Sequence, residues 1–250
     1  MQRPNYSKAP IIEAVIDLRV TPVEGFEVEQ FDALREQLQS DYPQFSFIET
    51  EQVEFRFEQE FTAQHNKRKN GVLLSSEGNT RLFQARLDGF TFSQRAPYDK
   101  WEPFRDEARR LWNIYRSFYP ASEITRVAHR AINQLNIVAE PGFELNKYLH
   151  TLPSASPEFP RGQMSGFFLQ LQLWQPDLEC SVVVNQAMVP PPEPEVVSIL
   201  LDFDLFQARP EEPWDIQQDE NAWDLLEKLH VRRNEMFQAS LTDDMKEQLR

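Results

Sequence analysis

Alternation of apolar and polar residues near the start of the chain predicts a β-strand with one buried face. In IIEAVIDLRV, residues 11–20, every second residue from Ile12 is apolar, and Glu13, Asp17 and Arg19 lie between them. Successive side chains of a strand point to opposite faces of its sheet, so the apolar set belongs to a core and the polar set to the other face. Pro10 suits the position before such a strand because its missing N–H breaks no central hydrogen bond there.

The same two periods predict the other elements. Apolar residues at intervals of three and four predict amphipathic helices at 27–42, 98–119 and 219–239. The second helix carries an aromatic stripe, and we expect Trp101, Trp112 and Trp223 to face the sheet or its flanks. Polar residues in HNKRKNG, 65–71, predict a turn. Strands are expected at 53–58, 72–76, 80–94, 124–138, 166–174, 180–189 and 196–206, with a short helix at 144–150.

These elements follow the order strand, helix, three strands, helix, twice over. The first series occupies residues 1–120 and the second 121–250, and LDGFTFSQRAP (87–97) and LDFDLFQARP (201–210) close them alike. We therefore expect an α+β protein of two similar halves forming one compact unit, with a mostly antiparallel sheet covered on one face by the long helices. Chance similarity between two amphipathic strands is the alternative. Duplication would let strand 11–20 pair with the end of its own series and with strand 124–138.

Composition and charge narrow the class of protein. The chain has 250 residues, of which 40% are hydrophobic, enough for a substantial core. It contains no apolar run long enough to span a membrane, and MQRPNYSKAP lacks the apolar centre of a signal peptide, so we expect a cytoplasmic protein. The net charge is −14, and residues 121–250 carry 10 Lys and Arg against 21 Asp and Glu. Such a field repels a phosphate backbone and argues against nucleic-acid binding.

Motifs for cofactors and metals are not found in the sequence. The chain has only seven glycines, and they form no glycine-rich phosphate loop. The histidines at 65, 129, 150 and 230 share no metal-ligand spacing. We expect no cofactor and no metal. His129 is interpreted as a packed or surface residue, and the single cysteine, Cys180, as a buried inert thiol in a strand.

Several charged groups fit either a functional or a structural interpretation. Asp202 and Asp204 share one strand face, as a metal or acid/base pair would require, but any half-exposed strand offers this geometry, and we expect a solvent face. The candidates for phosphate contact are Lys67, Arg68 and Lys69 in the expected turn and Arg105, Arg109 and Arg116 on the long helix. For the helix arginines, ion pairs within the helix are the favoured interpretation.

Three segments together resemble a known family. Y-x-x-x-P-I-I-E-A-V-I-D-L-R at the start, R-x-x-x-R-x-I-N-x-L-N-I in the middle and I-L-L-D-F-D-L-F late in the chain are similar to a sporadically distributed family of bacterial proteins of about this length. The resemblance implies a bacterial origin and patchy occurrence, as for genes of defence or toxin–antitoxin systems. It implies no activity.

The polar faces of the two strands that open each series hold the candidate site. Asp17, Arg19, Arg130, Asn133 and Asn136 are the candidate ligand- or partner-binding residues, with Asn133 on the apolar side of its strand. Charges in central strands are costly unless they pair or face water, so the arginines either form structural bridges or line an open face.

The function that we expect is therefore binding rather than catalysis. We expect an acidic partner protein, antitoxin-like, immunity-like or defence-related, in a bacterial two-gene system, with its protein partner encoded by a neighbouring gene. The alternative is an enzyme or sensor that binds a small anionic ligand between the halves. A homodimer is compatible with either function.

Overall fold

The described residues form a ten-stranded antiparallel sheet and four α-helices, which confirms the α+β class. The structure is a computed structural model and describes residues 6, 9–57, 61–156, 158 and 164–250, without the side chains of 51–67. The helices are α1 (Asp32–Leu38), α2 (Trp101–Phe118), α3 (Glu220–Ser240) and α4 (Asp243–Gln248). The strands are β1 (Ile11–Val20), β2 (Gln44–Phe57), β3 (Phe61–Ser75), β4 (Arg81–Arg86), β5 (Gly89–Arg95), β6 (Glu123–Val138), β7 (Phe168–Gln175), β8 (Cys180–Val189), β9 (Val196–Ala208) and β10 (Trp214–Asp215).

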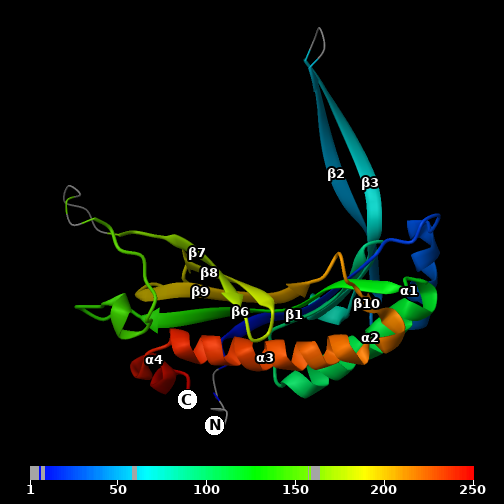
Figure 1. The fold of residues 1–250 in the computed structure, drawn as a ribbon. Coiled ribbons are helices and arrows are strands. Elements are labelled where there is room, and N and C mark those ends of the chain that lie inside the picture. The colour runs from blue at the N-terminus through cyan, green and yellow to red at the C-terminus, as the bar shows by residue number, and fades with distance from the viewer. Residues whose placement is uncertain (1–5, 7–8, 58–60, 157, 159–163) are drawn as a thin grey trace.

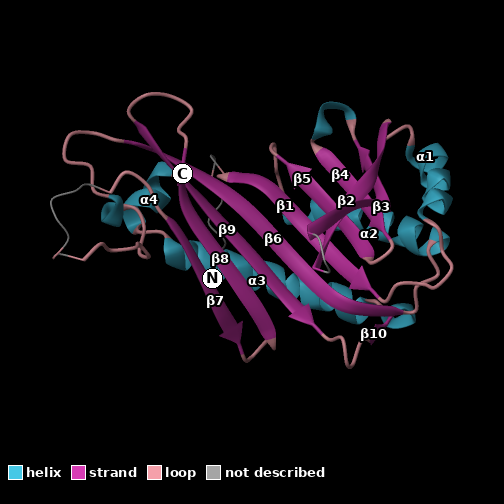
Figure 2. Cartoon of the chain, turned by 90° about the horizontal axis from the view of Figure 1, so that it is seen from above, coloured by secondary structure: helices cyan, strands magenta, loops and turns pink. Residues whose placement is uncertain are grey.

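The first strand of the chain lies in the middle of the sheet. The strand order is β2-β3-β4-β5-β1-β6-β9-β8-β7, with β10 beside β6 (Figure 2). β1 pairs with β5 on one side, Asp17 opposite Thr91, and with β6 on the other, Ile16 opposite His129. These pairings confirm the expectation that the first strand joins the end of its own series to strand 124–138.

One face of the sheet is the core face, covered by α2 and α3 (Figure 1). In β1 the residues Ala14, Ile16, Leu18 and Val20 are buried, as their period of two predicts, whereas Ile12 of the same set is 36% exposed. The stripe on α2 is buried as well, and Trp112 meets Phe90 of β5 edge to face at 5.6 Å. Trp101, Trp112 and Trp223 are each less than 5% exposed, which confirms the predicted placement. Within the described chain, the helices lack the combination of length and hydropathy that crossing a membrane requires.

Two local predictions for the first series are wrong. Residues 65–71 lie inside β3 and form no turn, because the basic run is in register with the acidic run of β2: Glu49 is opposite Lys69. β2 and β3 form a long hairpin that rises from the side of the sheet away from α2 and α3 (Figure 1). Residues 80–94 are a hairpin of β4 and β5, with the reversal just before Gly89, whose φ is +153°. A Cβ at Gly89 would lie 2.4 Å from the Leu18 carbonyl oxygen, so the close approach of β5 to β1 at this position requires glycine.

The short helix expected at 144–150 is also wrong in its second part. Only Leu145–Lys147 are helical, as a 3₁₀ segment. The backbone that follows them is hydrogen-bonded to residues after α3 and at its end. Leu149 forms an isolated bridge with Leu241, and the His150 N–H donates to the Ser240 carbonyl at 3.0 Å. In the first series, a 3₁₀ turn at Val28–Phe31 precedes α1 within the helix expected at 27–42.

The structure gives no support for two similar halves. Four strands follow α1 in the first series, and the two closing segments differ in the direction of their side chains. Aligning LDGFTF with LDFDLF matches Phe90 to Asp204, yet Phe90 is buried in the core whereas Asp204 lies on the opposite face. The sheet also continues without interruption across residue 120, through the pairing of β1 with β6. The division into 1–120 and 121–250 stays a prediction.

Candidate functional site

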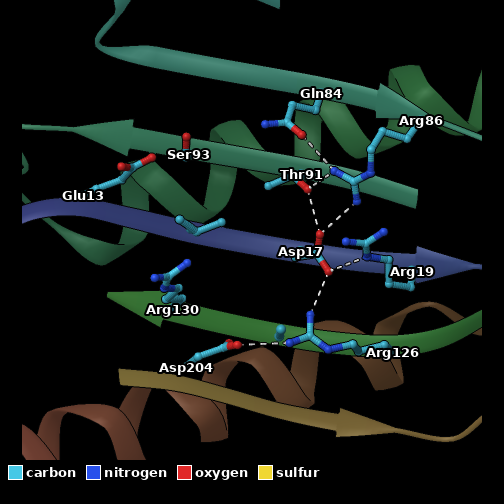
Figure 3. A pocket seen from close by; sticks show the side chains of 12 residues that line it. Glu13, Asp17, Arg19, Gln84, Arg86, Thr91, Ser93, Arg126, Arg130 and Asp204 are labelled. Atoms are coloured by element: carbon cyan, nitrogen blue, oxygen red, sulfur yellow. Dashed lines mark hydrogen bonds and ion pairs between the residues drawn. The ribbon is translucent and has the colours of Figure 1, made fainter. Parts of the chain in front are cut away.

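The polar face of the central strands forms an open cavity of ≈ 610 Å³ on the side of the sheet away from α2 and α3 (Figure 3). It lies across the junction of β1 and β6, with β4, β5 and β9 beside them. Arginines and carboxylates from β1, β4, β6 and β9 and hydroxyl groups from β5 line the same space. The lining residues are Glu13, Val15, Asp17, Arg19, Gln84, Arg86, Thr91, Ser93, Arg126, Ala128, Arg130 and Asp204.

Asp17 of β1 is the centre of this face. Its Oδ1 accepts hydrogen bonds from Arg19 Nε at 3.1 Å and Arg126 Nη1 at 2.8 Å. Its Oδ2 accepts from Arg86 Nη2 at 3.0 Å and from the Thr91 hydroxyl at 2.7 Å. These bonds from described residues use the lone-pair directions that a carboxylate has, and they join β4, β5 and β6 to β1. We call Asp17 and these four donors the Asp17 hub.

The charges around Asp17 keep it ionised. Burial of the carboxyl raises its pKa, but the guanidinium groups of Arg19 and Arg86, the Thr91 hydroxyl and Arg126 together hold the pKa of Asp17 below its usual value. Asp17 is therefore a structural anion at neutral pH and a poor base.

Arg86 of β4 is the most buried guanidinium of the hub, with a side chain 8% exposed. Besides Asp17 it donates to Asp88 at 3.0 Å, to Gln84 Oε1 at 3.0 Å and to the Thr91 hydroxyl at 2.5 Å. Gly71 of β3 lies against it, since a Cβ there would come within 2.9 Å of Arg86 Cγ. Arg86 is thus held in one position.

A second group lies on β6 and β9 and is linked to the hub by Arg126. Arg126 Nη2 donates to Asp204 at 3.2 Å. Arg130 donates to both oxygens of Asp202, at 2.8 and 2.7 Å, a bidentate arrangement that Asn185 of β8 completes with a bond of 3.0 Å. Burial raises the pKa of Asp204, although Arg126 and Arg130 oppose the rise. Asp204 is thus the carboxyl on this face that protonates most readily among those with a resolved shift.

The structure brings some of the predicted site residues together and separates others. Asp17, Arg19 and Arg130 line the cavity. Asn136 is on the same strand face nearer its end, where it accepts from the Ser198 hydroxyl at 2.6 Å. Asn133 is on the core face, fully buried, and donates to the Leu201 carbonyl at 3.1 Å, so it belongs to the apolar side.

Two arginines of the site were not predicted. Arg126 lies two strand periods before Arg130 on the same face of β6, so the alternation that places Arg130 could have found it. Arg86 could not be found in this way. It reaches Asp17 because of the reversal between β4 and β5, in a segment whose pattern predicts one long strand.

The other candidate groups have structural surroundings. His129 is fully buried on the core face, 4.9 Å from the Trp101 ring, and burial lowers its pKa to about 3, which confirms the packed interpretation. Cys180 is buried and free, as expected. Lys69 pairs with Glu29 at 3.0 Å.

The helix arginines are ion-paired, and all three reach partners in another part of the chain. Arg105 donates to Glu227 of α3 at 2.7 Å and Arg116 to Asp219 at 2.6 Å, while Arg109 pairs with Glu220. The expectation of pairs within the helix is confirmed for Arg105, which also pairs with Asp106 at 2.7 Å, and is wrong for Arg109 and Arg116. The contacts outside the helix form because α3 packs alongside α2. Its acidic residues come within reach of the α2 arginines.

The class that this fold and site define is an α+β protein with one face of its sheet under helices and the other carrying a network of ion pairs. Among the described residues, no cluster of three or more His, Cys, Asp or Glu could hold a metal ion. No protein-family model matches the chain, and no curated protein does so either. The resemblance to the sporadically distributed bacterial family stays a prediction.

Proposed function

We propose that the protein binds a protein partner through the open face centred on the Asp17 hub and does not catalyse a reaction there. The observation that carries the proposal is the saturated hub itself: its charges are fixed in position by one another and face the solvent side of the sheet. A surface whose polar groups are already oriented binds at a lower entropic cost than one that must be ordered.

The chemistry of the lining residues supports binding over catalysis. A general base needs a free lone pair and a pKa near the working pH, and Asp17 has neither. Thr91 would be a nucleophile only if a base took its proton, and Asp17, which accepts its hydrogen bond, is a poor base because its pKa is below the usual value. Guanidinium groups stay protonated near neutral pH and cannot act as general bases.

The balance of charge supports a partner segment of mixed charge. The guanidiniums of Arg19, Arg86, Arg126 and Arg130 meet the carboxylates of Glu13, Asp17, Asp88, Asp202 and Asp204, so the face has no large excess of either sign. Arg130 is 44% and Arg19 38% exposed in their side chains, and these heads remain available to an acidic group of the partner. The Glu13 carboxylate can pair with a basic group of the partner.

The biological setting belongs to the same proposal. The resemblance to a family of patchy occurrence supports a role as the antitoxin-like, immunity-like or defence-related partner in a bacterial two-gene system, in the cytoplasm, with its partner encoded by the neighbouring gene. The acidic character of the chain, with a net charge of −14, favours a protein over a nucleic acid as that partner.

A small anionic ligand is the second candidate. It is favoured by the cavity across β1 and β6, where Arg126 and Arg130 approach Asp204. An anion there would add to the repulsion on Asp204, so its binding should strengthen as the pH falls and that carboxyl is protonated.

The test compares partner and small-anion binding in one set of variants. The neighbouring gene's product is titrated by calorimetry into the wild-type protein and into Arg19→Gln and Arg130→Gln, with Arg232→Gln as control, because Arg232 pairs with Asp177 and Glu235 outside the cavity. We expect at least about tenfold weaker binding for the first two variants, a loss of ~1.4 kcal/mol, and no change for the control, all with folded spectra.

Equal affinity in all four proteins would refute the proposed surface. Saturable binding of phosphate or citrate, lost in Arg130→Gln, without any binding of the neighbouring product would favour the small-ligand candidate instead.

A further inference from the structure

The edge strand β7 is an uncharged surface in a strongly acidic chain. β2 and β7 end the strand order of the described sheet, and they differ in composition. β2 contains Glu49, a charge of the kind that protects an exposed edge against pairing. β7, FLQLQLWQ, contains none, although the whole chain has a net charge of −14.

The hydrogen-bonding groups of β7 that point away from β8 belong to alternate residues. The Met188 N–H donates to the Phe167 carbonyl at 3.1 Å, so residues 167, 169, 171, 173 and 175 are those that bond to β8 in this antiparallel pair. The backbone N–H and C=O groups of Phe168, Gln170, Gln172 and Trp174 therefore point to the free edge. A further strand can bond there.

The sequence of this edge has the same pattern in both directions. From residue 168 to 174 it runs aromatic, Leu, Gln, Leu, Gln, Leu, aromatic. We propose that two copies of the chain form a symmetric homodimer by antiparallel pairing of β7 with β7, with the two-fold axis at Leu171. This register sets Phe168 opposite Trp174 of the partner subunit, and Gln170 opposite Gln172 of the partner subunit. It pairs the residues whose backbone groups are free.

Both faces of the paired strands are then matched. On the helix side, Leu169, Leu171 and Leu173 line an apolar groove of ≈ 200 Å³ together with Met236 of α3, and the three leucines of each copy meet those of the other. On the open side, Phe168 is 68% and Trp174 59% exposed, and cross-strand aromatic pairing would cover both. Isologous contacts of this kind need a self-complementary patch, and β7 is one.

The distribution of charge favours a second copy of the chain as the molecule that pairs with the free edge of β7. Two chains of net charge −14 repel one another over most approaches, and the repulsion is smallest where an uncharged strand meets an uncharged strand. The nearest carboxylate after β7, Asp177, falls opposite Ser165 of the partner subunit in this register and meets no like charge. The inference does not depend on the proposed partner role of the Asp17 face, and either can fail alone.

Sedimentation equilibrium of the full chain tests the dimer. We expect a dimer for the wild-type protein and at least about 30-fold weaker association for Leu171→Lys, which sets two ammonium groups across the axis. Val138→Lys adds the same charge at an exposed apolar position of β6 and should leave the dimer unchanged. A monomeric wild-type protein at all concentrations, or a dimer that Leu171→Lys does not weaken, would overturn the proposal.

Cysteine cross-linking tests the register without adding charge. Under mild oxidation Leu171→Cys should form a disulfide-linked dimer, because residue 171 faces its own copy across the axis. Leu169→Cys alone should not cross-link, whereas a mixture of Leu169→Cys and Leu173→Cys should. The native Cys180 is buried and provides the unlinked background. Cross-linking of Leu169→Cys alone, or its failure for Leu171→Cys in a dimeric sample, would overturn the proposed register.

Discussion

Replacing the central carboxylate of the hub is the most direct test of how the open face is held together. Asp17→Asn keeps the shape of the side chain but removes its charge, and it turns an amide N–H toward guanidinium donors. Asp17 is 13% and Arg86 8% exposed in their side chains, so the pair is largely desolvated. Removing one partner of a buried ion pair costs about 3–5 kcal/mol because the other charge is left uncompensated.

The lower end of that range is expected here. Arg86 and Arg19 keep Asp88, and Arg126 keeps Asp204, so each guanidinium retains a carboxylate. We expect a loss of about 3 kcal/mol, which corresponds to a fall in Tm of roughly 6–12 °C for a chain of this size. Urea unfolding followed by circular dichroism measures the loss, and an unchanged m-value would show that the unfolded state is the same.

The dependence on pH provides a second check on the same variant. The pKa of Asp17 is lowered in the folded state, so its contribution to stability is complete above the unfolded value of about 3.9 and is lost as the pH falls through the folded value. The difference in the free energy of unfolding between the wild type and Asp17→Asn should be constant from about pH 5 to 8 and shrink below about pH 4.

Glu13→Gln is the matched control, because Glu13 lines the same cavity at a distance from the hub (Figure 3). It should change stability by less than about 0.5 kcal/mol. A loss of less than about 1 kcal/mol in the free energy of unfolding for Asp17→Asn would refute this account of the hub. A difference between wild type and variant that does not depend on pH would refute it as well.

Three other predictions concern the core side and the backbone. Trp101→Ala should cost roughly 3–5 kcal/mol in urea unfolding, and a cost below about 1 kcal/mol would contradict burial of the α2 stripe. Gly89→Ala should cost about 2 kcal/mol or more through its φ of +153° and the Leu18 carbonyl, whereas Gly166→Ala, with open space around it, should be nearly neutral. The His129 ring resonances should not titrate between about pH 5 and 8. Because the pKa of His129 is lowered to about 3, its unfolded form takes up a proton first, and stability should fall as the pH drops below about 6.5; a resonance that titrates near pH 6.5 would disprove its burial.

The sequence predicted elements well where one period governs a segment. The alternation in β1, β6 and β9 and the stripe of α2 depend on a single buried face, and each was located to within a few residues. Prediction failed where a partner distant in the sequence decides the outcome. Polar residues 65–71 resemble a turn because the acidic β2 that pairs with them lies elsewhere in the sequence. Asp88-Gly89 is a local turn signal, but the long alternation around it favoured one strand over a hairpin of β4 and β5.

The candidate site was predictable to the same extent. Asp17, Arg19 and Arg130 follow from strand alternation, since polar residues on central strands must share the uncovered face. Arg86 depends on a contact across 69 positions in the sequence, which no period encodes. Duplication was inferred partly from the similar sequences of residues 87–97 and 201–210. That similarity did not predict which face of the sheet each side chain lies on.

The central position of β1 has a consequence for synthesis of the protein on the ribosome. β1 ends at Val20, and the strand that completes its pairing, β6, ends at Val138, 118 residues later. At translation rates of about 5–20 residues per second, the first strand waits roughly 6–24 s with its apolar face and at least one edge unpaired. We therefore expect the nascent chain to bind chaperones that hold extended apolar segments, and its yield to depend on them far more than the stability of the finished sheet would indicate.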